Sequence, residues 1–486
     1  MLFNSFVFIF IFLPIVFGVY FLFNRLKKVR LSIYWLILSS LFFYGYFEPQ
    51  YVILISISIM INFLLGRLLM KSGPIQKKKF YLTLGILFNV LLLGYYKYAD
   101  FFIANMNIVF GTSYPFLYLL LPIGLSFITF QQIAYLVDAY KGETKRNTFA
   151  AYALFITFFP QLIAGPIVHH KEMMPQFAAE QNKRINLEHV FKGIFIFLIG
   201  LTKKVAIADT VAVWADDGFK NYQNLTFAES WITSLSYTIQ LYFDFSGYCD
   251  MAIGLGLLFN IKLPINFNSP YRSRNIQEFW TRWHMTLNRF LTKYVYFPLG
   301  GSRKGAVRTY IHIFIIFLIS GFWHGAGWNF MIWGVLHGLA SIALRLWGRT
   351  KINPPYWLSW FITFQFVNIA WVYFRATSVE QANTIIAKMF QPEWSDLQRF
   401  FTSPVNHFTE AATYQIGTLA FNHPIFIGAV IGTLLCLCFI AKNSIEWLDR
   451  FTFNGRYIVY YQALLMIILI SVFIRQKNSM FLYFNF

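Results

Sequence analysis

Long apolar stretches, separated by short polar loops, follow one another along nearly the whole chain. A helix needs about 20 mainly apolar residues to cross the roughly 30 Å hydrocarbon core of a bilayer, because each residue advances it by 1.5 Å. About thirteen stretches approach this length, at residues 6–23, 33–47, 52–70, 80–96, 116–137, 149–168, 190–208, 231–259, 309–322, 330–346, 357–374, 425–440 and 457–474. The pattern predicts an all-α polytopic membrane protein with about 11–13 membrane segments. Several stretches contain Pro and Gly, so we expect re-entrant or interfacial helices among them.

The composition supports a membrane protein and excludes other classes. Apolar residues make up 57% of the chain and charged residues 12%, whereas a soluble domain carries about 25% charged residues. The 21% of aromatic residues excludes a disordered chain. Basic loops on the cytoplasmic side of a bilayer explain why 40 Lys and Arg face only 20 Asp and Glu. We therefore expect this charge to meet membrane lipids and no nucleic acid.

Two basic loops orient the N-terminal part of the chain. Residues 25–30 and 67–79 are rich in Lys and Arg, which predicts a cytoplasmic position for both loops and an external Met1. The first apolar stretch lacks a basic leader and a small-residue cleavage site, which indicates an uncleaved helix.

The chain shows no internal repeat and no low-complexity linker, which predicts a single domain. The predicted layout is a domain over residues 1–486, a catalytic core at about 115–345, and peripheral helices at 1–110 and 355–486. Ser378, followed three residues later by Gln381, resembles a capping box and predicts an amphipathic surface helix. The three cysteines lie in apolar stretches and suggest neither a disulfide framework nor a zinc site.

Two acids interrupt the apolar stretch at 231–259. Asp244 and Asp250 carry a high cost in a membrane segment, so each invites a functional hypothesis. A proton relay or a coupling-ion site is one reading. We favour the other, in which hydrogen bonds of these carboxylates fix helix packing.

An amphipathic helix is predicted from Ile276 to Tyr294. At 100° per residue the apolar side chains share one line, and Arg282 lies on the opposite face. His284 falls on the border between the faces. A histidine there is more typical of a structural hydrogen bond than of catalysis.

His324 breaks an apolar stretch in a segment rich in glycine and aromatic residues, which runs from Gly321 to Asn329. Small neighbours allow a ligand or a backbone to come close, and an imidazole suits proton transfer at neutral pH. A core histidine bonded to a carbonyl is the equal alternative. His169 and His170 are a possible metal pair, but a solvated loop is favoured, and we predict no metal.

Seven motifs, in order, resemble the membrane-bound O-acyltransferase family, in the branch of alginate and peptidoglycan O-acetyltransferases. They are Leu-Pro-Ile-Gly-Leu-Ser-Phe at 121–127, Tyr-Leu-Val-Asp at 135–138, Phe-Pro-Gln-Leu-Ile-Ala-Gly-Pro at 159–166, the stretch 242–256, Glu-Phe-Trp-Thr-Arg-Trp-His at 278–284, Leu-Gly-Gly-Ser-Arg-Lys-Gly at 299–305 and Trp-His-Gly at 323–325. The resemblance implies a funnel-shaped helical core in the bacterial inner membrane. It also implies that His324 is the principal catalytic residue and His284 its partner.

The reaction implied by the resemblance moves an acetyl group from a cytoplasmic thioester, acetyl-CoA, towards an acceptor on the other face, with no bound cofactor. His324 would act as a general base or form an acyl-histidine. Basic side chains would hold the donor's phosphates or, equally, lipid headgroups: Arg272, Arg274, Arg282, Arg303 and Lys304. Asp244, Asp250 and Asn329 would support the core.

The acceptor and partner are further expectations. Tyr483, in an aromatic segment, would relay the acyl group or anchor at the membrane interface, and we favour anchoring. No Gly-Asp-Ser motif is found, so an extracytoplasmic acetyltransferase is expected as a partner. Peptidoglycan is slightly preferred as the polysaccharide, with alginate or another exopolysaccharide as the alternative. A secondary transporter that uses Asp244 and Asp250 is the reading from another class.

Overall fold

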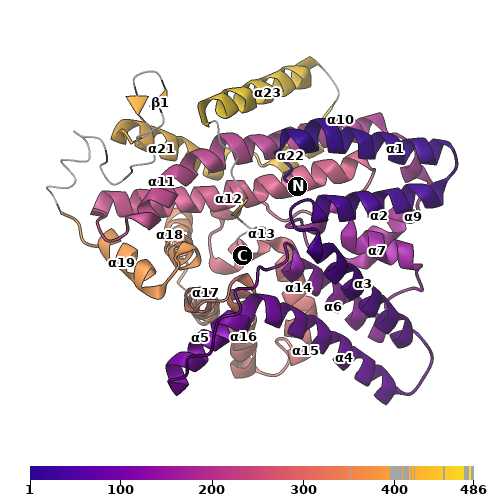
Figure 1. The fold of residues 1–486 in the computed structure, drawn as a ribbon. Coiled ribbons are helices and arrows are strands. Elements are labelled where there is room, and N and C mark those ends of the chain that lie inside the picture. Colours follow the sequence, from indigo (N-terminus) through magenta and orange to yellow (C-terminus); the bar gives the residue numbers. More distant parts are fainter. Residues whose placement is uncertain are drawn as a thin grey trace. The chain divides into compact units, whose positions relative to one another are not determined.

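The computed structural model is almost entirely helical (Figure 1). It describes residues 1–350, 352–393, 405, 408, 415–416, 419–420, 422–452, 455–475 and 481–482. The strands in this part of the chain are β1 (Gln415–Ile416) and β2 (Leu419–Ala420), a short antiparallel pair. The all-α prediction is therefore confirmed, while the single domain stays a prediction.

The chain forms two compact units, and each is described by itself. The first unit comprises Met1–Phe197 and Cys249–Ile265, and the second comprises Leu198–Tyr248 and Asn266–Leu482. The helices that begin in the first unit are α1 (Leu13–Arg25), α2 (Val29–Gly45), α3 (Gln50–Leu69), α4 (Ile75–Leu93), α5 (Ala99–Phe110), α6 (Leu125–Tyr140), α7 (Phe149–Thr157), α8 (Phe159–Leu162), α9 (His170–Ala178) and α10 (Leu187–Thr202). Those that begin in the second unit are α11 (Asp209–Lys220), α12 (Phe227–Leu258), α13 (Ile276–Arg282), α14 (Met285–Leu291), α15 (Phe297–Leu299), α16 (Ala306–His324), α17 (Trp328–Trp347), α18 (Tyr356–Arg375), α19 (Val379–Met389), α21 (Pro424–Ile440), α22 (Ser444–Asp449) and α23 (Gly455–Arg475).

Six helices in the described part of the chain are long and apolar enough to cross a membrane. They are Phe8–Arg25, Gln50–Leu69, Ile75–Phe110, Ala306–His324, Trp328–Trp347 and Tyr356–Arg375. Their outward side chains are strongly exposed and apolar; Phe10, Ile53 and Leu91 are examples. Water would disfavour such a surface, so these helices contact lipid.

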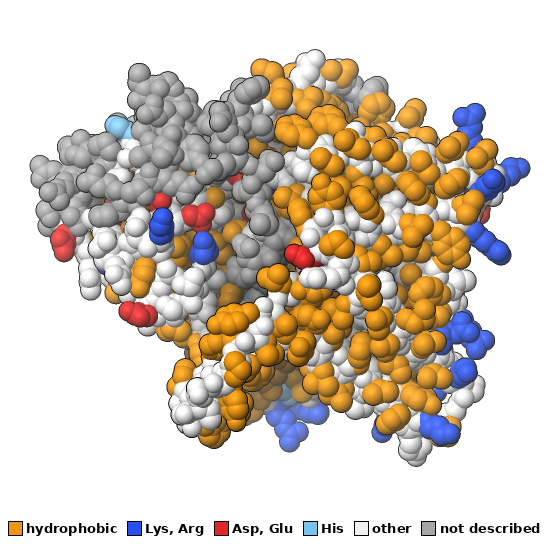
Figure 2. Space-filling model, in the orientation of Figure 1, with side chains coloured by type: hydrophobic (Ala, Val, Ile, Leu, Met, Phe, Trp, Pro, Cys, Tyr) orange, Lys and Arg blue, Asp and Glu red, His pale blue; other side chains and the backbone are white. Residues whose placement is uncertain are grey.

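The first unit shows this surface directly. In Figure 2 hydrophobic side chains cover most of the face over α1 to α4, while Lys and Arg gather at the edge where the α1–α2 and α3–α4 connections lie in Figure 1. This edge holds the two loops that the sequence predicts to be cytoplasmic. Segregation of basic side chains to one edge fits the positive-inside rule.

A polar network lies inside the first unit and ties α3, α4 and α6 together. Asn89 Nδ2 donates to Asn62 Oδ1 at 2.7 Å, and Asn62 Nδ2 donates to Gln132 Oε1 at 3.1 Å. The Ser58 hydroxyl donates to the same Gln132 oxygen at 2.9 Å. Amide side chains in apolar surroundings act as specific contacts between membrane helices, because unpaired amides are costly there.

Two apolar stretches are not continuous helices. In the stretch 116–137, which contains Pro122 and Gly124, helix α6 begins only at Leu125. The preceding residues form a loop held by Asp100, whose carboxylate accepts the backbone N–H groups of Leu117 and Tyr118. The stretch 149–168 is broken into α7 and α8, as its proline and glycine residues indicate.

Helix α19 confirms the prediction made from Ser378. The Ser378 hydroxyl accepts the backbone N–H of Gln381 at 3.1 Å and so begins the helix. The apolar face of α19 is buried through Ala382, Ile385 and Met389.

Candidate active site

The site is built around His284, which lies at a break between two helices. Helix α13 ends at Arg282 and α14 begins at Met285, so the prediction of one continuous helix here is wrong. His284 has a φ of 45°, a left-handed conformation that is rare for residues other than glycine. It is fully buried and not on the border between two faces.

Asn266 causes the break by offering the start of α14 other hydrogen-bond partners. Its carbonyl accepts the Met285 N–H at 3.0 Å. Its side-chain oxygen accepts both the N–H and the hydroxyl of Thr286, at 3.2 and 2.9 Å. These bonds satisfy N–H groups that would otherwise continue the helix from α13. They therefore also fix the position of His284.

His324 is the last residue of α16, and its neighbouring glycines serve helix packing. A Cβ on Gly321 would lie 2.4 Å from the carbonyl oxygen of Phe330 in α17, and one on Gly334 would lie 2.5 Å from that of Phe317. Only glycine allows the backbones of α16 and α17 to approach so closely. The close approach leaves His324 buried.

The two imidazole rings lie near each other inside an aromatic enclosure. Their centroids are 6.2 Å apart, with an angle of 61° between the ring planes. Trp323 contacts both rings, with centroids 4.8 Å from His324 and 6.1 Å from His284. Phe245 lies 5.0 Å from His284, and Phe374 lies 5.1 Å from His324. The structure thus brings together the two histidines that the resemblance implies, in surroundings that hold little water.

Burial sets the protonation state of His284, which lies outside the candidate spanning helices. Loss of hydration disfavours the charged imidazolium and lowers the pKa of His284 to about 3. The ring is therefore neutral at pH 7. A neutral imidazole carries one donor and one acceptor nitrogen, so one ring nitrogen can donate a hydrogen bond while the other accepts one.

A third buried histidine was missed by the sequence reasoning. The Trp280 indole N–H lies 3.2 Å from Nδ1 of His337, and the Trp333 ring lies 4.7 Å from the His337 ring. Trp333 also packs against His324, at 5.2 Å. His337 interrupts an apolar stretch just as His324 does, and that signal would have identified it.

The predicted core residues have different partners. Asn329 donates to the carbonyls of Tyr373 at 3.2 Å and Ala376 at 2.7 Å, which ties the start of α17 to the end of α18. Asp250 is buried in the part of α12 that belongs to the first unit. Tyr483 lies outside the described residues.

Asp244 is one member of a buried charge cluster that includes a lysine the sequence reasoning missed. Lys204 Nζ lies 2.7 Å from Asp244 and 2.9 Å from Asp209. An ammonium group thus stands where the transporter reading would require a coupling cation next to Asp244. A lysine inside the apolar stretch 190–208 was the signal for this cluster.

The predicted donor-binding residues divide into two groups. Arg274 and Arg282 both pair with Glu278, at 3.2 and 3.0 Å, and Arg272 donates to the carbonyl of Ala441. Arg303 and Lys304 are exposed in the loop before α16. The first three side chains therefore serve contacts within the chain, although Arg274 is also exposed, as are Arg303 and Lys304.

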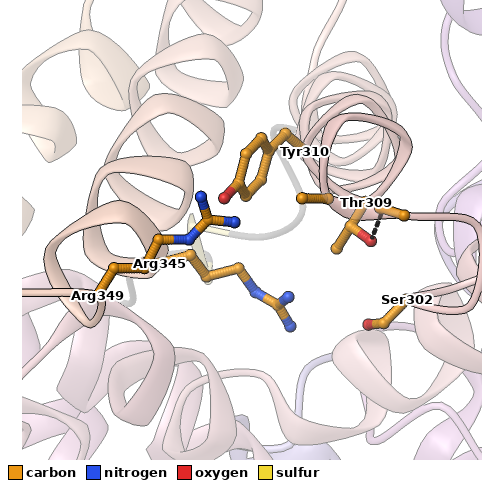
Figure 3. A pocket seen from close by; sticks show the side chains of 7 residues that line it. Ser302, Thr309, Tyr310, Arg345 and Arg349 are labelled. Atoms are coloured by element: carbon orange, nitrogen blue, oxygen red, sulfur yellow. Dashed lines mark hydrogen bonds between the residues drawn. The ribbon is translucent and has the colours of Figure 1, made fainter.

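A pocket of about 270 Å³ lies beside this loop (Figure 3). Arg345, in the last turn of α17, and Arg349, just after this helix, face Ser302, Thr309 and Tyr310 across it. Neither arginine forms an ion pair with a carboxylate in the described part of the chain. Sequence reasoning missed both residues, because only the packing of α16 on α17 brings them to the loop.

A second pocket, of about 250 Å³, shares Arg345 with the first. It extends along α16 to Ser320, one helical turn before His324, and is also lined by Trp280. Together the two pockets follow α16 from its basic end towards the histidine pair.

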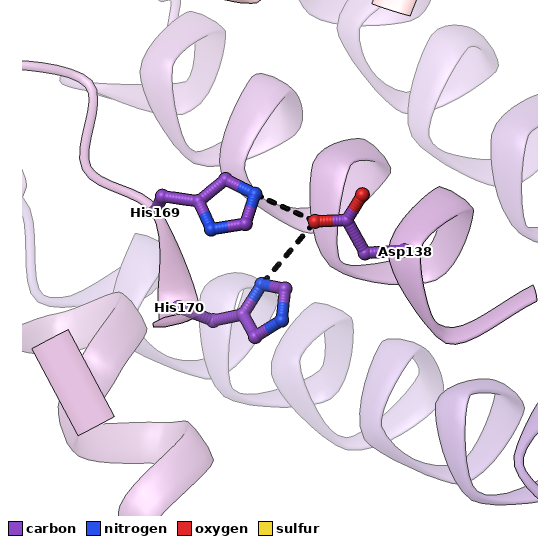
Figure 4. Close-up of side chains that lie close together, drawn as sticks. All are labelled: Asp138, His169 and His170. Atoms are coloured by element: carbon purple, nitrogen blue, oxygen red, sulfur yellow. Dashed lines mark ion pairs between the residues drawn. The ribbon is translucent and has the colours of Figure 1, made fainter. Parts of the chain in front are cut away.

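The first unit contains a separate cluster of Asp138, His169 and His170 (Figure 4). Asp138 Oδ2 lies 2.6 Å from His169 Nε2 and 3.8 Å from His170 Nδ1. The set matches the ligand types of a zinc site. However, the Lys171 N–H donates to Nδ1 of His169, which places the proton on Nε2, towards Asp138. The predicted solvated loop is wrong, because Asp138 and His170 are buried.

Comparison with known proteins now adds to this geometry. The model of MBOAT, the membrane-bound O-acyltransferase family, matches residues 136–380. The chain is 43% identical to a peptidoglycan O-acetyltransferase of Helicobacter pylori, over 100% of this chain and 98% of the relative. It is 39% identical to a probable alginate O-acetylase AlgI of Pseudomonas aeruginosa, over 80% and 75% of the two chains. A teichoic acid D-alanyltransferase of Bacillus subtilis is 27% identical over 49% and 62%.

Proposed function

Because the chain belongs to the membrane-bound O-acyltransferase family, we propose that it transfers acetyl groups for the O-acetylation of a cell-envelope polysaccharide. Peptidoglycan is the preferred acceptor, since the relative named for it aligns over the full chain, whereas the alginate relative aligns over 80%. The observation that carries the proposal is the buried pair of His284 and His324 in an aromatic enclosure.

In the proposed mechanism His324 is the general base. Its imidazole takes the proton of an acceptor hydroxyl, while the hydroxyl oxygen attacks the carbonyl carbon of the acetyl thioester. The carbon–sulfur bond then breaks, and the thiolate receives the proton from the imidazolium. A base in this position is worth roughly 10²- to 10⁴-fold in rate. A transient acyl-histidine is the alternative route.

His284 and the aromatic walls prepare this reaction. The neutral ring of His284 places a dipole next to His324 and adds no second positive charge there. Exclusion of water by Trp323 and Phe374 strengthens electrostatic interactions and limits hydrolysis of the thioester.

The proposed donor is acetyl-CoA, with its phosphates at Arg345 and Arg349. Guanidinium groups bind phosphate oxygens in a fixed fork geometry, and Arg303 and Lys304 add positive charge nearby. Helix α16 rises by about 27 Å between Ala306 and His324. The donor would therefore lie along the second pocket, with its thioester at the histidines and its charged end at the basic loop.

We also propose that the protein lies in the bacterial inner membrane and passes the acetyl group to the outer side. An extracytoplasmic acetyltransferase would then place it on the polysaccharide. The proposed cytoplasmic position of the donor site rests on the exposed basic residues Arg303 and Lys304 in the loop before α16. Tyr483 remains a proposed acyl relay, with interface anchoring as the preferred alternative.

The test is base-released acetate from purified peptidoglycan and secreted polysaccharide. Cells with His324→Ala are compared with wild type at equal membrane levels, and His189→Gln, a half-buried histidine of the first unit, is the matched control. We expect loss of acetate from peptidoglycan with His324→Ala only. Unchanged acetate in both fractions would refute the proposal, and loss from the secreted fraction alone would name the other acceptor.

A further inference from the structure

Residues 481–482 make three separate contacts with α12 and its neighbourhood. The Leu482 N–H donates to Asp244 Oδ2 at 2.9 Å. The Phe481 ring is fully buried and lies edge-on to Tyr248, at 5.0 Å between centroids. Lys204 Nζ lies 4.6 Å from the centre of the same ring. Phe481 is therefore held inside the second unit, and the anchoring predicted for the aromatic segment does not apply to this side chain.

The charges explain why Asp244 receives this segment. Lys204 binds Asp244 Oδ1, which directs Oδ2 to the Leu482 N–H. The cluster contains two carboxyl groups, from Asp244 and Asp209, and one ammonium group, from Lys204. A buried carboxylate needs hydrogen-bond donors for both oxygens, and a backbone N–H supplies one without adding a further charge.

The residue that follows Asp244 in α12 contacts one member of the histidine pair. Phe245 follows Asp244 in α12, and its ring is 5.0 Å from that of His284. Tyr248, which receives Phe481, is one helical turn after Asp244. One short part of α12 thus contacts both the segment 481–482 and the candidate catalytic site.

We propose that Asp244, Lys204 and Tyr248 form a docking site for residues 481–482, and that docking positions this segment as part of the catalytic site. Asp244 acts here as a positioning residue, through the Leu482 backbone, and does not touch the reacting atoms. The inference rests on the proposed acetyl transfer for its effect on rate, while docking itself is independent of the reaction.

The first experiment removes the hydrogen bond that Leu482 donates. Leu482→Pro lacks the backbone N–H, whereas Leu482→Ala keeps it and shortens the same side chain. In purified enzyme we expect Leu482→Pro to lower kcat about 10- to 100-fold, with little change in KM for acetyl-CoA, because a bond to a charged group is lost and the segment shifts. Leu482→Ala is expected to stay within about 2-fold of wild type. Equal activity of the two variants would overturn the inference.

The second experiment measures docking without catalysis. A chain ending at residue 480 is mixed with a fluorescent synthetic peptide of residues 481–486, and binding is followed by anisotropy. We expect saturable binding, rescue of acetyl transfer by the same peptide, and neither effect with proline at the position of Leu482. Absence of binding, or equal binding of the proline peptide, would overturn docking.

Variants of the receiving residues separate docking from folding. Asp244→Ala in the shortened chain is expected to weaken peptide binding at least about 10-fold. Asp250→Ala, which removes another acidic side chain of α12, is the matched control. If the shortened chain binds the peptide but His324→Ala in the full chain transfers acetate normally, the proposed function fails and docking stands. If His324→Ala is inactive and Leu482→Pro is as active as wild type, only this inference fails.

Discussion

Gly321 tests whether close approach of α16 and α17 determines the position of His324. A Cβ at Gly321 would lie 2.4 Å from the Phe330 carbonyl oxygen, and an ordinary contact begins at 3.4 Å. Gly321→Ala must therefore separate the two backbones by about 1 Å. Overpacking of this kind costs about 1–3 kcal/mol, which exceeds the gain of up to about 1 kcal/mol from alanine's helix propensity.

The same displacement acts on the reaction, because His324 lies three residues beyond Gly321. A misplacement of 1 Å reduces rates by about 100-fold, so we expect Gly321→Ala to lose about 10- to 100-fold in acetyl transfer and to melt at a lower temperature. Thermal unfolding in detergent and initial rates with acetyl-CoA measure the two effects.

Gly18→Ala is the matched control, since no atom lies within 4 Å of the added Cβ in α1. It is expected to leave the rate unchanged and to raise the melting temperature slightly. The reasoning is refuted if Gly321→Ala retains wild-type stability and activity, or if both glycine variants lose activity equally.

Three further predictions concern charge and protonation. Lys204→Met leaves the Asp209 and Asp244 carboxylates without their shared cation. We expect it to lower the free energy of unfolding by about 3–5 kcal/mol in denaturant titrations. Lys204→Arg, which keeps the charge, is expected to lower it less. Burial lowers the pKa of His284 from 6.5 to about 3, so between pH 3 and pH 6.5 the unfolded chain binds a proton at this residue and the folded chain does not. The contribution of the neutral ring to the free energy of unfolding is therefore fully present above about pH 6.5 and falls by up to about 1.4 kcal/mol per pH unit below it. His284→Asn should reduce this slope in melting curves. Arg345→Gln with Arg349→Gln is expected to raise KM for acetyl-CoA about 10-fold with a smaller effect on kcat, and a KM equal to that of wild type in steady-state assays would contradict the proposed phosphate site.

Much of the fold was predictable because membrane helices carry a strong local signal. The stretch 52–70 corresponds to α3 (Gln50–Leu69), and 330–346 corresponds to α17 (Trp328–Trp347). About 20 apolar residues suffice to specify such a helix, whatever its neighbours are. His324 was identified for the same reason, since a polar side chain within an apolar stretch is costly without a purpose.

The elements that sequence reasoning missed depend on contacts between distant residues. Asn266 binds Thr286 across 20 residues and so breaks the helix at His284, and Asp244 binds Leu482 across 238 residues. Periodicity describes only near neighbours, so it cannot report that a carbonyl from another segment replaces a helical acceptor. Arg345 likewise becomes a pocket residue only when α17 returns beside α16.

The backbone at His284 links these long-range contacts to the chemistry. A left-handed φ at a residue other than glycine costs on the order of 1–3 kcal/mol, and it persists because Asn266 holds Met285 and Thr286 on its far side. A continuous helix would avoid this cost, but it would also place His284 on the border between its faces. The break instead sends the ring into the enclosure shared with His324. The strained backbone at His284 is therefore required for the two imidazole rings to lie side by side, and the hydrogen bonds of Asn266 hold the backbone in this conformation.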